Sequence, residues 1–335
     1  MTSPSGPAPL LQNALRFLEA GDAPAAEILA DTHVGKNPDD PEGFNVLGLI
    51  AQKRGALDAA SLAFQRAIEL NPAEINYTIH LATVVADQGR LPDALQAIEA
   101  ALQRRPGHCD ALLARSLLLQ RMGRLDDAIA GARMALAFHR QNARPHQVLG
   151  TLLLKARQAG DAVQALSEAT RLAPDSVDGW VNLGVAQRET GDLSSAEFSY
   201  RQALNLAPDD AIARNNLGNV LSAGGHHGAA SEEYRKAIAI KPDYAEAKAN
   251  LANAMRDIGQ AEEALALLES AAEQHADHAG VLNAFGNQLR IAEQYDRAIE
   301  VLSRAVTIYP CHSPQPDWWR HRQLPPQTGC AHHRP

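Results

Sequence analysis

Aromatic residues are scarce in this sequence of 335 residues: phenylalanine, tryptophan and tyrosine together make up 4% of it. Strands are enriched in aromatic and β-branched residues, so this composition, with its abundant alanine and leucine, favours helix over sheet. Cysteine is also rare. The three cysteines, Cys109, Cys311 and Cys330, lie far apart and unevenly, so we expect no disulfide framework.

Long apolar runs and an excess of basic charge are missing as well. No stretch approaches the roughly 18 uninterrupted apolar residues that a membrane span needs, and the N-terminus has no basic segment followed by an apolar one. The net charge of -8 argues against a nucleic-acid backbone as the main partner. We therefore expect a soluble, cytoplasmic protein that neither inserts into a membrane nor binds nucleic acid.

What the sequence does have is a period of 34 residues. Seven prolines are separated by 34 residues or a multiple of it: Pro38, Pro72, Pro106, Pro174, Pro208, Pro242 and Pro310. Arg140 and Ala276 stand where two further prolines would complete the series, and the period continues past both. Such self-similarity is the signature of a repeat architecture.

Nine units can be laid out with the proline at position 32 of each. They span residues 7–40, 41–74, 75–108, 109–142, 143–176, 177–210, 211–244, 245–278 and 279–312. Position 8 is always alanine, glycine or serine, and position 20 is always alanine: Ala26, Ala60, Ala94, Ala128, Ala162, Ala196, Ala230, Ala264 and Ala298. Position 27 is alanine in eight units, with His33 as the exception. Position 15 is glycine in seven: Gly21, Gly55, Gly89, Gly123, Gly191, Gly225 and Gly259.

These regularities predict two short helices in each unit, A and then B. Glycine at position 15 ends helix A because glycine adopts left-handed backbone angles without penalty, and the proline ends helix B. Small residues at positions 8, 20 and 27 allow close helix packing, with side chains such as Phe64 and Tyr200 filling the remaining space. One unit alone leaves apolar surface bare, so neighbouring units must stack. The prediction is an all-α solenoid of about nine 34-residue repeats.

The pattern resembles the tetratricopeptide repeat. The sixth unit carries that family's signature residues: Trp180, Leu183, Gly184, Ala196, Tyr200, Ala203 and Pro208. The resemblance covers residues 7–312 and implies a right-handed superhelix whose A helices line a concave face. Departures are local: Arg115 replaces a leucine, Arg157 and Glu293 replace the turn glycine, and Asn13 and His33 mark a degenerate first unit.

Residues that suggest chemistry are mostly explained by the repeat. Gly218 and Gly225 occupy a packing and a turn position, and no phosphate-binding loop surrounds them. His226 and His227 fall in an exposed turn, without further ligands at metal-binding spacing. No nucleophile–base arrangement, carboxylate pair or nucleotide loop is evident. We expect no enzyme activity, no cofactor and no metal.

Asparagines on helix A are the candidate binding residues. Positions 2, 5, 6, 9, 12 and 13 recur at three- and four-residue steps and share one face. They hold Asn182, Asn216, Asn250, Asn219, Asn253, Asn287 and Asn283. Stacking would align these amides along a groove, where they could bind the alternating donors and acceptors of an extended peptide. Alternatively, they bond to the neighbouring repeat's backbone. The ladder resembles the asparagine-lined repeats of O-linked N-acetylglucosamine transferase, and the likeness concerns the repeats alone.

Basic residues on the same face suggest that the groove attracts acidic segments. Positions 12 and 13 carry Arg188, Arg256 and Arg290, together with Lys53, Arg121 and Lys155. Asp87, Glu189 and Asp257 lie among them, so a mixed solvated face is the alternative. Some family members clamp a chaperone's terminal carboxylates with a basic residue at position 5. None occurs there from the second unit on, so that clamp is not expected.

The two ends fall outside the repeats. Residues 1–6 are expected to be disordered. Residues 313–335, rich in proline, histidine and arginine, also predict a disordered tail. A zinc site is a second interpretation, using Cys311, His312, His321, Cys330, His332 and His333. A chain cut short or frame-shifted out of a longer protein is a third. With no polar capping helix after it, the ninth unit is expected to expose apolar surface.

The functional hypothesis is a scaffold that binds extended peptide segments of partner proteins in the concave groove of its repeats. The alternative is a substrate-recruiting repeat arm, possibly truncated, of a glycosyltransferase- or sulfotransferase-type enzyme, because arrays of this family are often fused to such domains.

Overall fold

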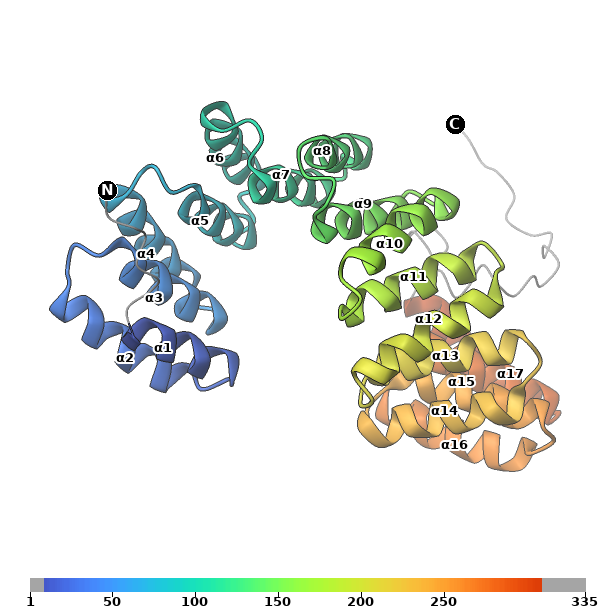
Figure 1. Cartoon of the computed structure of the whole chain (residues 1–335). Coiled ribbons are helices and arrows are strands. Elements are labelled where there is room, and N and C mark those ends of the chain that lie inside the picture. Colours follow the sequence, from blue (N-terminus) through green and yellow to red (C-terminus); the bar gives the residue numbers. More distant parts are fainter. Residues whose placement is uncertain (1–8, 309–335) are drawn as a thin grey trace, which may run out of the picture. The chain divides into compact units, whose positions relative to one another are not determined.

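The computed structural model describes residues 9–308, which form 18 helices arranged as nine A/B pairs (Figure 1). The A helices are α1 (Pro9–Glu19), α3 (Pro41–Lys53), α5 (Ile75–Asp87), α7 (Cys109–Arg121), α9 (Ala143–Lys155), α11 (Val177–Glu189), α13 (Ala211–Ala223), α15 (Ala245–Asp257) and α17 (Ala279–Ile291). The B helices are α2 (Ala23–Lys36), α4 (Leu57–Leu70), α6 (Leu91–Arg104), α8 (Leu125–Phe138), α10 (Ala159–Leu172), α12 (Leu193–Leu206), α14 (His227–Ile240), α16 (Ala261–Gln274) and α18 (Tyr295–Ile308). The all-α repeat fold expected from the sequence is confirmed.

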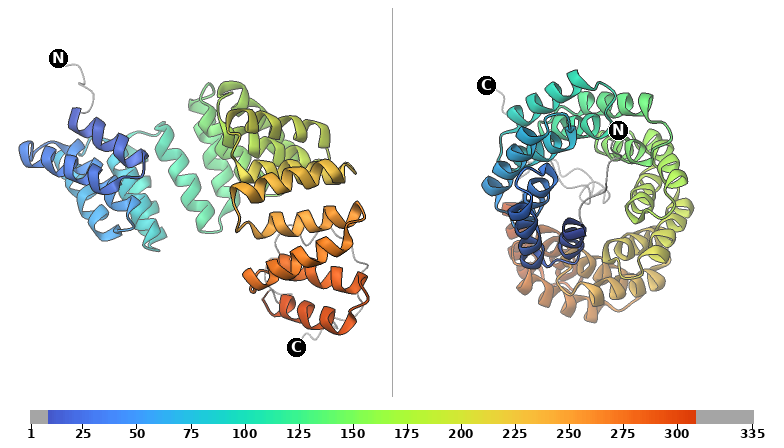
Figure 2. Two further views of the ribbon diagram at one scale, coloured as in Figure 1. Left: turned by 90° about the horizontal axis from the view of Figure 1, so that it is seen from below. Right: turned by 60° about the vertical axis from the view of Figure 1, so that its left-hand side comes forward.

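The chain divides within α11 into two compact units, Met1–Ala186 and Gln187–Pro335. Inside each unit, successive helix pairs stack side by side (Figure 2). Within each unit, neighbouring A helices contact one another, as α5 does α7 and α15 does α17, whereas no two described B helices of the same unit do. The A helices therefore lie on the inner side of each unit's curve.

Packing within a repeat depends on the small residues that the sequence singled out. The nine alanines at position 20 are buried, and the least buried of them, Ala298, is 3% exposed. A Cβ atom at Gly48 would lie 2.5 Å from Cε1 of Phe64, and one at Gly218 would lie 2.5 Å from Cε1 of Tyr234. Glycine at position 8 thus makes room for an aromatic ring at position 24 of the same repeat, which explains how two short helices bury large side chains.

The turn between helices A and B has the predicted left-handed residue in every repeat. All seven glycines at position 15 have positive φ, between 75° and 86°. In the fifth and ninth repeats, Arg157 and Glu293 keep the same conformation, with φ of 61° and 60°. The geometry of the turn therefore persists where its usual residue is lost, and these two residues carry the strain that glycine avoids.

Replacing Glu293 with glycine should stabilise the ninth repeat by about 0.5–1 kcal/mol, because glycine relieves the left-handed strain. Gly89→Ala is the reverse substitution. A Cβ atom there would meet nothing within 4 Å, so strain alone should destabilise the chain, by about 1 kcal/mol. Urea denaturation followed by circular dichroism measures both changes. Equal stability of the Glu293→Gly variant and the wild type would contradict the strain argument.

The ends of the helices differ from the prediction in one respect. Helices α8 and α16 end at the same repeat position as the others, although Arg140 and Ala276 replace the proline that follows. Proline is thus compatible with the end of helix B but does not cause it. Most A helices begin with a side-chain cap; Asp210, for example, accepts hydrogen bonds from the backbone N–H groups of Ile212 and Ala213. The expectations for residues 1–6 and 313–335, including the zinc interpretation, lie outside the described residues.

Candidate functional site

The predicted asparagine ladder lies mostly in the second unit, on α13, α15 and α17. We call this group the amide cluster; it comprises Asn215, Asn216, Asn219, Asn250, Asn253, Asn283 and Asn287. Asn215 is 4% exposed and the other six are half-buried. The depth of position 5 varies between repeats, since Asn215 and its equivalent Asn45 are buried whereas Asn283 is half-buried. Asn182, on α11, belongs to the first unit and is half-buried.

One part of the amide cluster is bonded internally. The Asn250 amide nitrogen donates to Oδ1 of Asn215, at 3.1 Å, and to Oδ1 of Asn219, at 3.0 Å. The Tyr234 hydroxyl also donates to Oδ1 of Asn219, at 2.9 Å. Asn250 thus binds side chains of the preceding repeat, whereas the alternative interpretation of the ladder had it binding backbone. These bonds fix α15 against α13.

The remaining amides are open. Asn216, Asn253, Asn283 and Asn287 are half-buried, and among residues 9–308 their side chains have no hydrogen-bond partner. Each of them offers one acceptor oxygen and two donor hydrogens. A half-buried amide without a protein partner bonds to water or to a ligand, because leaving it unbonded costs free energy. These four side chains are the part of the ladder that makes no hydrogen bond within residues 9–308.

The arginines beside the amide cluster differ in their pairing. Arg256 donates from Nε, at 2.9 Å, and from Nη2, at 2.6 Å, to Oδ1 of Asp257, its neighbour in α15. Arg188 and Arg290 have no ion-pair partner in the described part of the chain. Arg188 lies near enough to Tyr200 and Tyr234 to oppose the rise that burial causes in the pKa of both hydroxyls. The face is therefore mixed in charge, with two cations available.

The two turn histidines show no metal-binding arrangement. His226 is exposed and precedes α14 without a side-chain capping bond, whereas His227 is the first residue of that helix and lies with Nδ1 3.7 Å from Oδ2 of Asp257. Within residues 9–308, no group of three or more histidine, cysteine or acidic side chains is placed to hold a metal ion.

The first unit has a separate inner-face feature that we call the polar hollow. It has a volume of about 550 Å³ and lies over α3, α5, α7 and α9. Its lining includes Glu42, Asn45, Glu74, Asn76, Tyr77, Ile79, His80, Thr83, Asp110 and Arg144. Arg144 is hydrogen-bonded to Asp110 across two successive repeats. The hollow thus combines carboxylates, amides and a ring nitrogen in one open depression.

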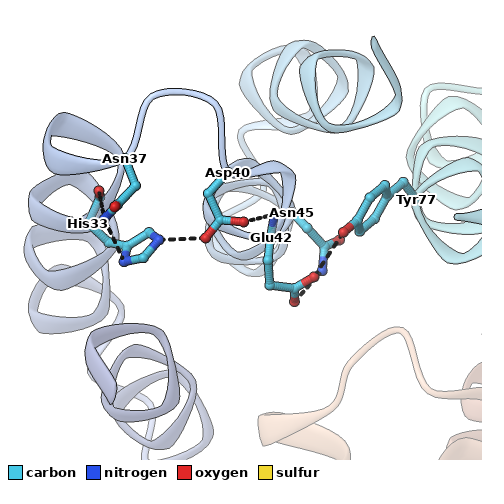
Figure 3. A network of polar contacts seen from close by, with 6 residues as sticks. All are labelled: His33, Asn37, Asp40, Glu42, Asn45 and Tyr77. Atoms are coloured by element: carbon cyan, nitrogen blue, oxygen red, sulfur yellow. Dashed lines mark hydrogen bonds and ion pairs between the residues drawn. The ribbon is translucent and has the colours of Figure 1, made fainter. Parts of the chain in front are cut away.

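A network of hydrogen bonds holds one wall of the polar hollow (Figure 3). Glu42 accepts from the Asn45 amide and from the Tyr77 hydroxyl, each at 3.1 Å. In α2, the buried His33 ring lies with Nε2 2.7 Å from Oδ2 of Asp40. Asp40 also caps α3, because it accepts a hydrogen bond from the Glu42 backbone N–H. His33, the exception at position 27, is therefore held by a charged partner inside the fold.

Burial shifts the protonation of the two titratable side chains that face Asn45 and Glu42. Burial, with the nearby Glu42 carboxylate, raises the pKa of Tyr77, which keeps its hydroxyl as a donor. Burial lowers the pKa of His80 below its usual value, although Asp110 and Glu74 oppose the shift. The neutral His80 ring donates from Nδ1 to Oδ1 of Asn45, at 2.8 Å.

The polar hollow was missed in the sequence, although the signal was present. Its residues occupy the same A-helix positions as the asparagines: Glu42, Asp110 and Arg144 at position 2, Asn45 at position 5, His80 at position 6 and Thr83 at position 9. The prediction of a binding face relied on one residue type, asparagine, that recurs at these positions. In the first unit the residue types vary, so the shared face was not recognised.

Models of known families match nearly the whole helical region. A tetratricopeptide repeat model matches residues 11–75, 80–143, 148–199 and 191–245, and another model of the same repeat matches residues 221–284. This chain belongs to the tetratricopeptide repeat family. The helix pairs, the alanines at position 20 and the left-handed turns described above are thus those of tetratricopeptide repeats. No curated protein matches the sequence significantly.

One similar solved structure shares this fold at low sequence identity, and two others match it over part of the chain. The crystal structure of the APC/C hetero-tetramer Cut9–Hcn1 matches with a TM-score of 0.59 and 14% identity, over 90% of this chain and 62% of that chain. Two crystal structures of MamA match half of this chain, with TM-scores of 0.46 and 0.47, identities of 20% and 24%, and 97% and 92% of their own chains.

In the described tetratricopeptide region, no helix is long and apolar enough to cross a bilayer.

Proposed function

We propose that this tetratricopeptide repeat protein is an interaction scaffold that binds an extended segment of a partner protein along the amide cluster of its second unit. The observation that carries the proposal is the set of four half-buried amides, Asn216, Asn253, Asn283 and Asn287, that have no hydrogen-bond partner among residues 9–308. They lie on three successive A helices, on the inner side of the unit's curve.

The chemistry of these side chains fits a peptide backbone. An extended backbone presents N–H and C=O groups in alternation, and an amide side chain can bind either group. The internal bonds of Asn250 to Asn215 and Asn219 help by fixing the surrounding helices before a ligand arrives, which reduces the entropy lost on binding. Arg188 and Arg290 would add affinity for segments that carry acidic side chains.

The proposal is tested by replacing the four open asparagines together. We expect an Asn216→Ala, Asn253→Ala, Asn283→Ala, Asn287→Ala variant to recover captured partner proteins at least about 10-fold less efficiently than the wild type, because each lost hydrogen bond contributes roughly 0.5–1.5 kcal/mol. Affinity capture followed by quantitative mass spectrometry measures the recovery, and circular dichroism checks that the helices remain.

A matched control replaces exposed asparagines away from the cluster. Asn13→Ala with Asn205→Ala removes two exposed amides from α1 and α12, and recovery should stay at the wild-type level. Unchanged recovery by the fourfold variant, with its helices intact, would refute the amide cluster as the binding site. The arm of a glycosyltransferase- or sulfotransferase-type enzyme stays the alternative prediction, since recruiting a substrate would use the same face.

A further inference from the structure

The polar hollow of the first unit carries an excess of negative charge. Its lining holds three carboxylates, those of Glu42, Glu74 and Asp110, against one guanidinium, that of Arg144. The His80 ring adds no positive charge at neutral pH, because burial lowers its pKa. The volume of about 550 Å³ lies within the range of about 300–1,000 Å³ that is usual for ligand sites. The hollow is therefore large enough for a ligand and electrostatically suited to a cation.

Most hydrogen-bond donors of the polar hollow are already used inside the protein. Four lining side chains donate to acceptors of the same unit: Tyr77 and Asn45 to the Glu42 carboxylate, Thr83 to the Ile79 carbonyl oxygen, and Arg144 to the Asp110 carboxylate. The exposed Asn76 amide is the exception, since its side chain has no hydrogen-bond partner among residues 9–308. A ligand therefore meets few donors in the hollow.

The hydrogen bonds of Asn45 determine which nitrogen of His80 carries the proton. The Asn45 amide nitrogen donates to Glu42, so the Asn45 oxygen must accept from Nδ1 of His80, which lies 2.8 Å away. A neutral imidazole carries one proton, so Nε2 of His80 is left as an acceptor. In the described residues, Nε2 has no hydrogen-bond partner, and neither do Oε2 of Glu74 and Oδ2 of Asp110. The free positions in the hollow are thus mainly acceptors.

These acceptors are held in position by the surrounding side chains. Asn45 and Tyr77, which connect α3 to α5 through Glu42, are 6% and 5% exposed (Figure 3). The His80 ring lies 5.4 Å from the ring of the fully buried Phe64, which limits its movement. Groups that are ordered before a ligand arrives lose less entropy on binding.

We propose that the polar hollow binds a cationic side chain, lysine or arginine, of a partner protein. An ammonium or guanidinium group has donors and no acceptor, so it matches a lining whose free groups are Oε2 of Glu74, Oδ2 of Asp110 and Nε2 of His80. A metal ion fits less well, because no group of three or more histidine, cysteine or acidic side chains within residues 9–308 is placed to hold one. The site lies in the first unit, and it selects the charge opposite to that attracted by Arg188 and Arg290 beside the amide cluster.

The test uses a labelled peptide of alternating glycine and lysine with blocked ends, and fluorescence anisotropy with the full chain should show saturable binding. Glu74→Gln with Asp110→Asn should weaken binding at least about 10-fold, because losing one hydrogen bond to a charged group already has about that effect. Glu99→Gln with Asp126→Asn is the matched control. It removes two exposed carboxylates from α6 and α8, so the net charge changes equally, and binding should change less than about twofold.

A second variant leaves every carboxylate of the polar hollow in place. Thr83 is an exposed residue of the lining, so Thr83→Lys supplies an ammonium group from the chain itself without disturbing the core. This variant should also weaken peptide binding at least about 10-fold, because its own charge occupies or repels from the site. Thr83→Gln adds a side chain of similar reach without charge and should bind the peptide as the wild type does. Circular dichroism checks that the helices remain in each variant.

Three outcomes would overturn the proposal. The first is absent binding, or equal binding of the same peptide with its lysines acetylated, which would remove the role of charge. The second is an equal loss in the control variant, which would assign binding to general attraction by an acidic surface. The third is loss of binding in the fourfold asparagine variant alone, which would place the peptide on the amide cluster. That variant should bind the lysine peptide normally, so the proposed function and this site can fail separately.

Discussion

Phe64→Ala should lower the free energy of unfolding of the first unit by about 3–5 kcal/mol, the usual cost of deleting a fully buried aromatic ring. Phe64 is 0% exposed and fills the space that Gly48 leaves open between α3 and α4. Its ring also lies 5.4 Å from that of His80, on the next A helix. Removing the ring would leave a cavity between α3 and α4. The backbones of these two helices cannot move together to close it, because position 20 of the same repeat already holds a buried alanine.

Urea denaturation measures this loss, with the two units treated as separate transitions because repeat arrays need not unfold in one step. Leu62→Ala is the control. Leu62 lies two residues away on the same helix but is 68% exposed, so its removal should change stability by less than about 0.5 kcal/mol. Gly48→Ala added to Phe64→Ala should regain part of the loss, since a Cβ atom fills some of the cavity and alanine favours helix by about 1 kcal/mol. A loss for Leu62→Ala as large as that for Phe64→Ala would contradict this account.

Arg214→Met should cost the second unit about 2–3 kcal/mol, because it removes a largely buried charge from three hydrogen bonds. Nη1 of Arg214 donates to Oε2 of Glu233 at 3.0 Å, and Nη2 and Nε donate to the carbonyl oxygen of Pro208 at 2.6 and 3.1 Å. The two charged side chains are 18% and 14% exposed. The guanidinium thus joins the loop before α13 to both helices of the seventh repeat, and methionine keeps only its apolar stem.

The matched control is Arg171→Met. Arg171 bonds to Glu168 one turn away on α10, but it is 60% exposed, so the change should stay below about 0.5 kcal/mol. Raising the salt concentration should leave the Arg214 effect largely intact, because buried pairs are screened less than exposed ones. Denaturation curves in low and high salt measure the change in stability caused by each of the two substitutions. An Arg214→Met variant as stable as the wild type would contradict this prediction. It would show that the attraction between Arg214 and Glu233 only compensates for the cost of removing the two charges from water.

The sequence alone determined the fold, because in every repeat helices A and B pack against each other through residues of similar size at the same positions. The alanines at position 20 and the glycines at positions 8 and 15 predicted the helix pairs and left-handed turns that the structure has. Arg157 and Glu293 show how strongly the fold imposes that turn, since both accept it without being glycine. The helical face of the asparagines followed from the same periodicity.

The tertiary structure decided which polar groups remain available, because that depends on distances between repeats that no period encodes. It bonded Asn250 to Asn215 and Asn219 but left Asn216, Asn253, Asn283 and Asn287 open. It also brought Glu42, Tyr77 and His80 together in the first unit, where the sequence shows no repeated residue type. Identical positions thus acquire different roles through their neighbours.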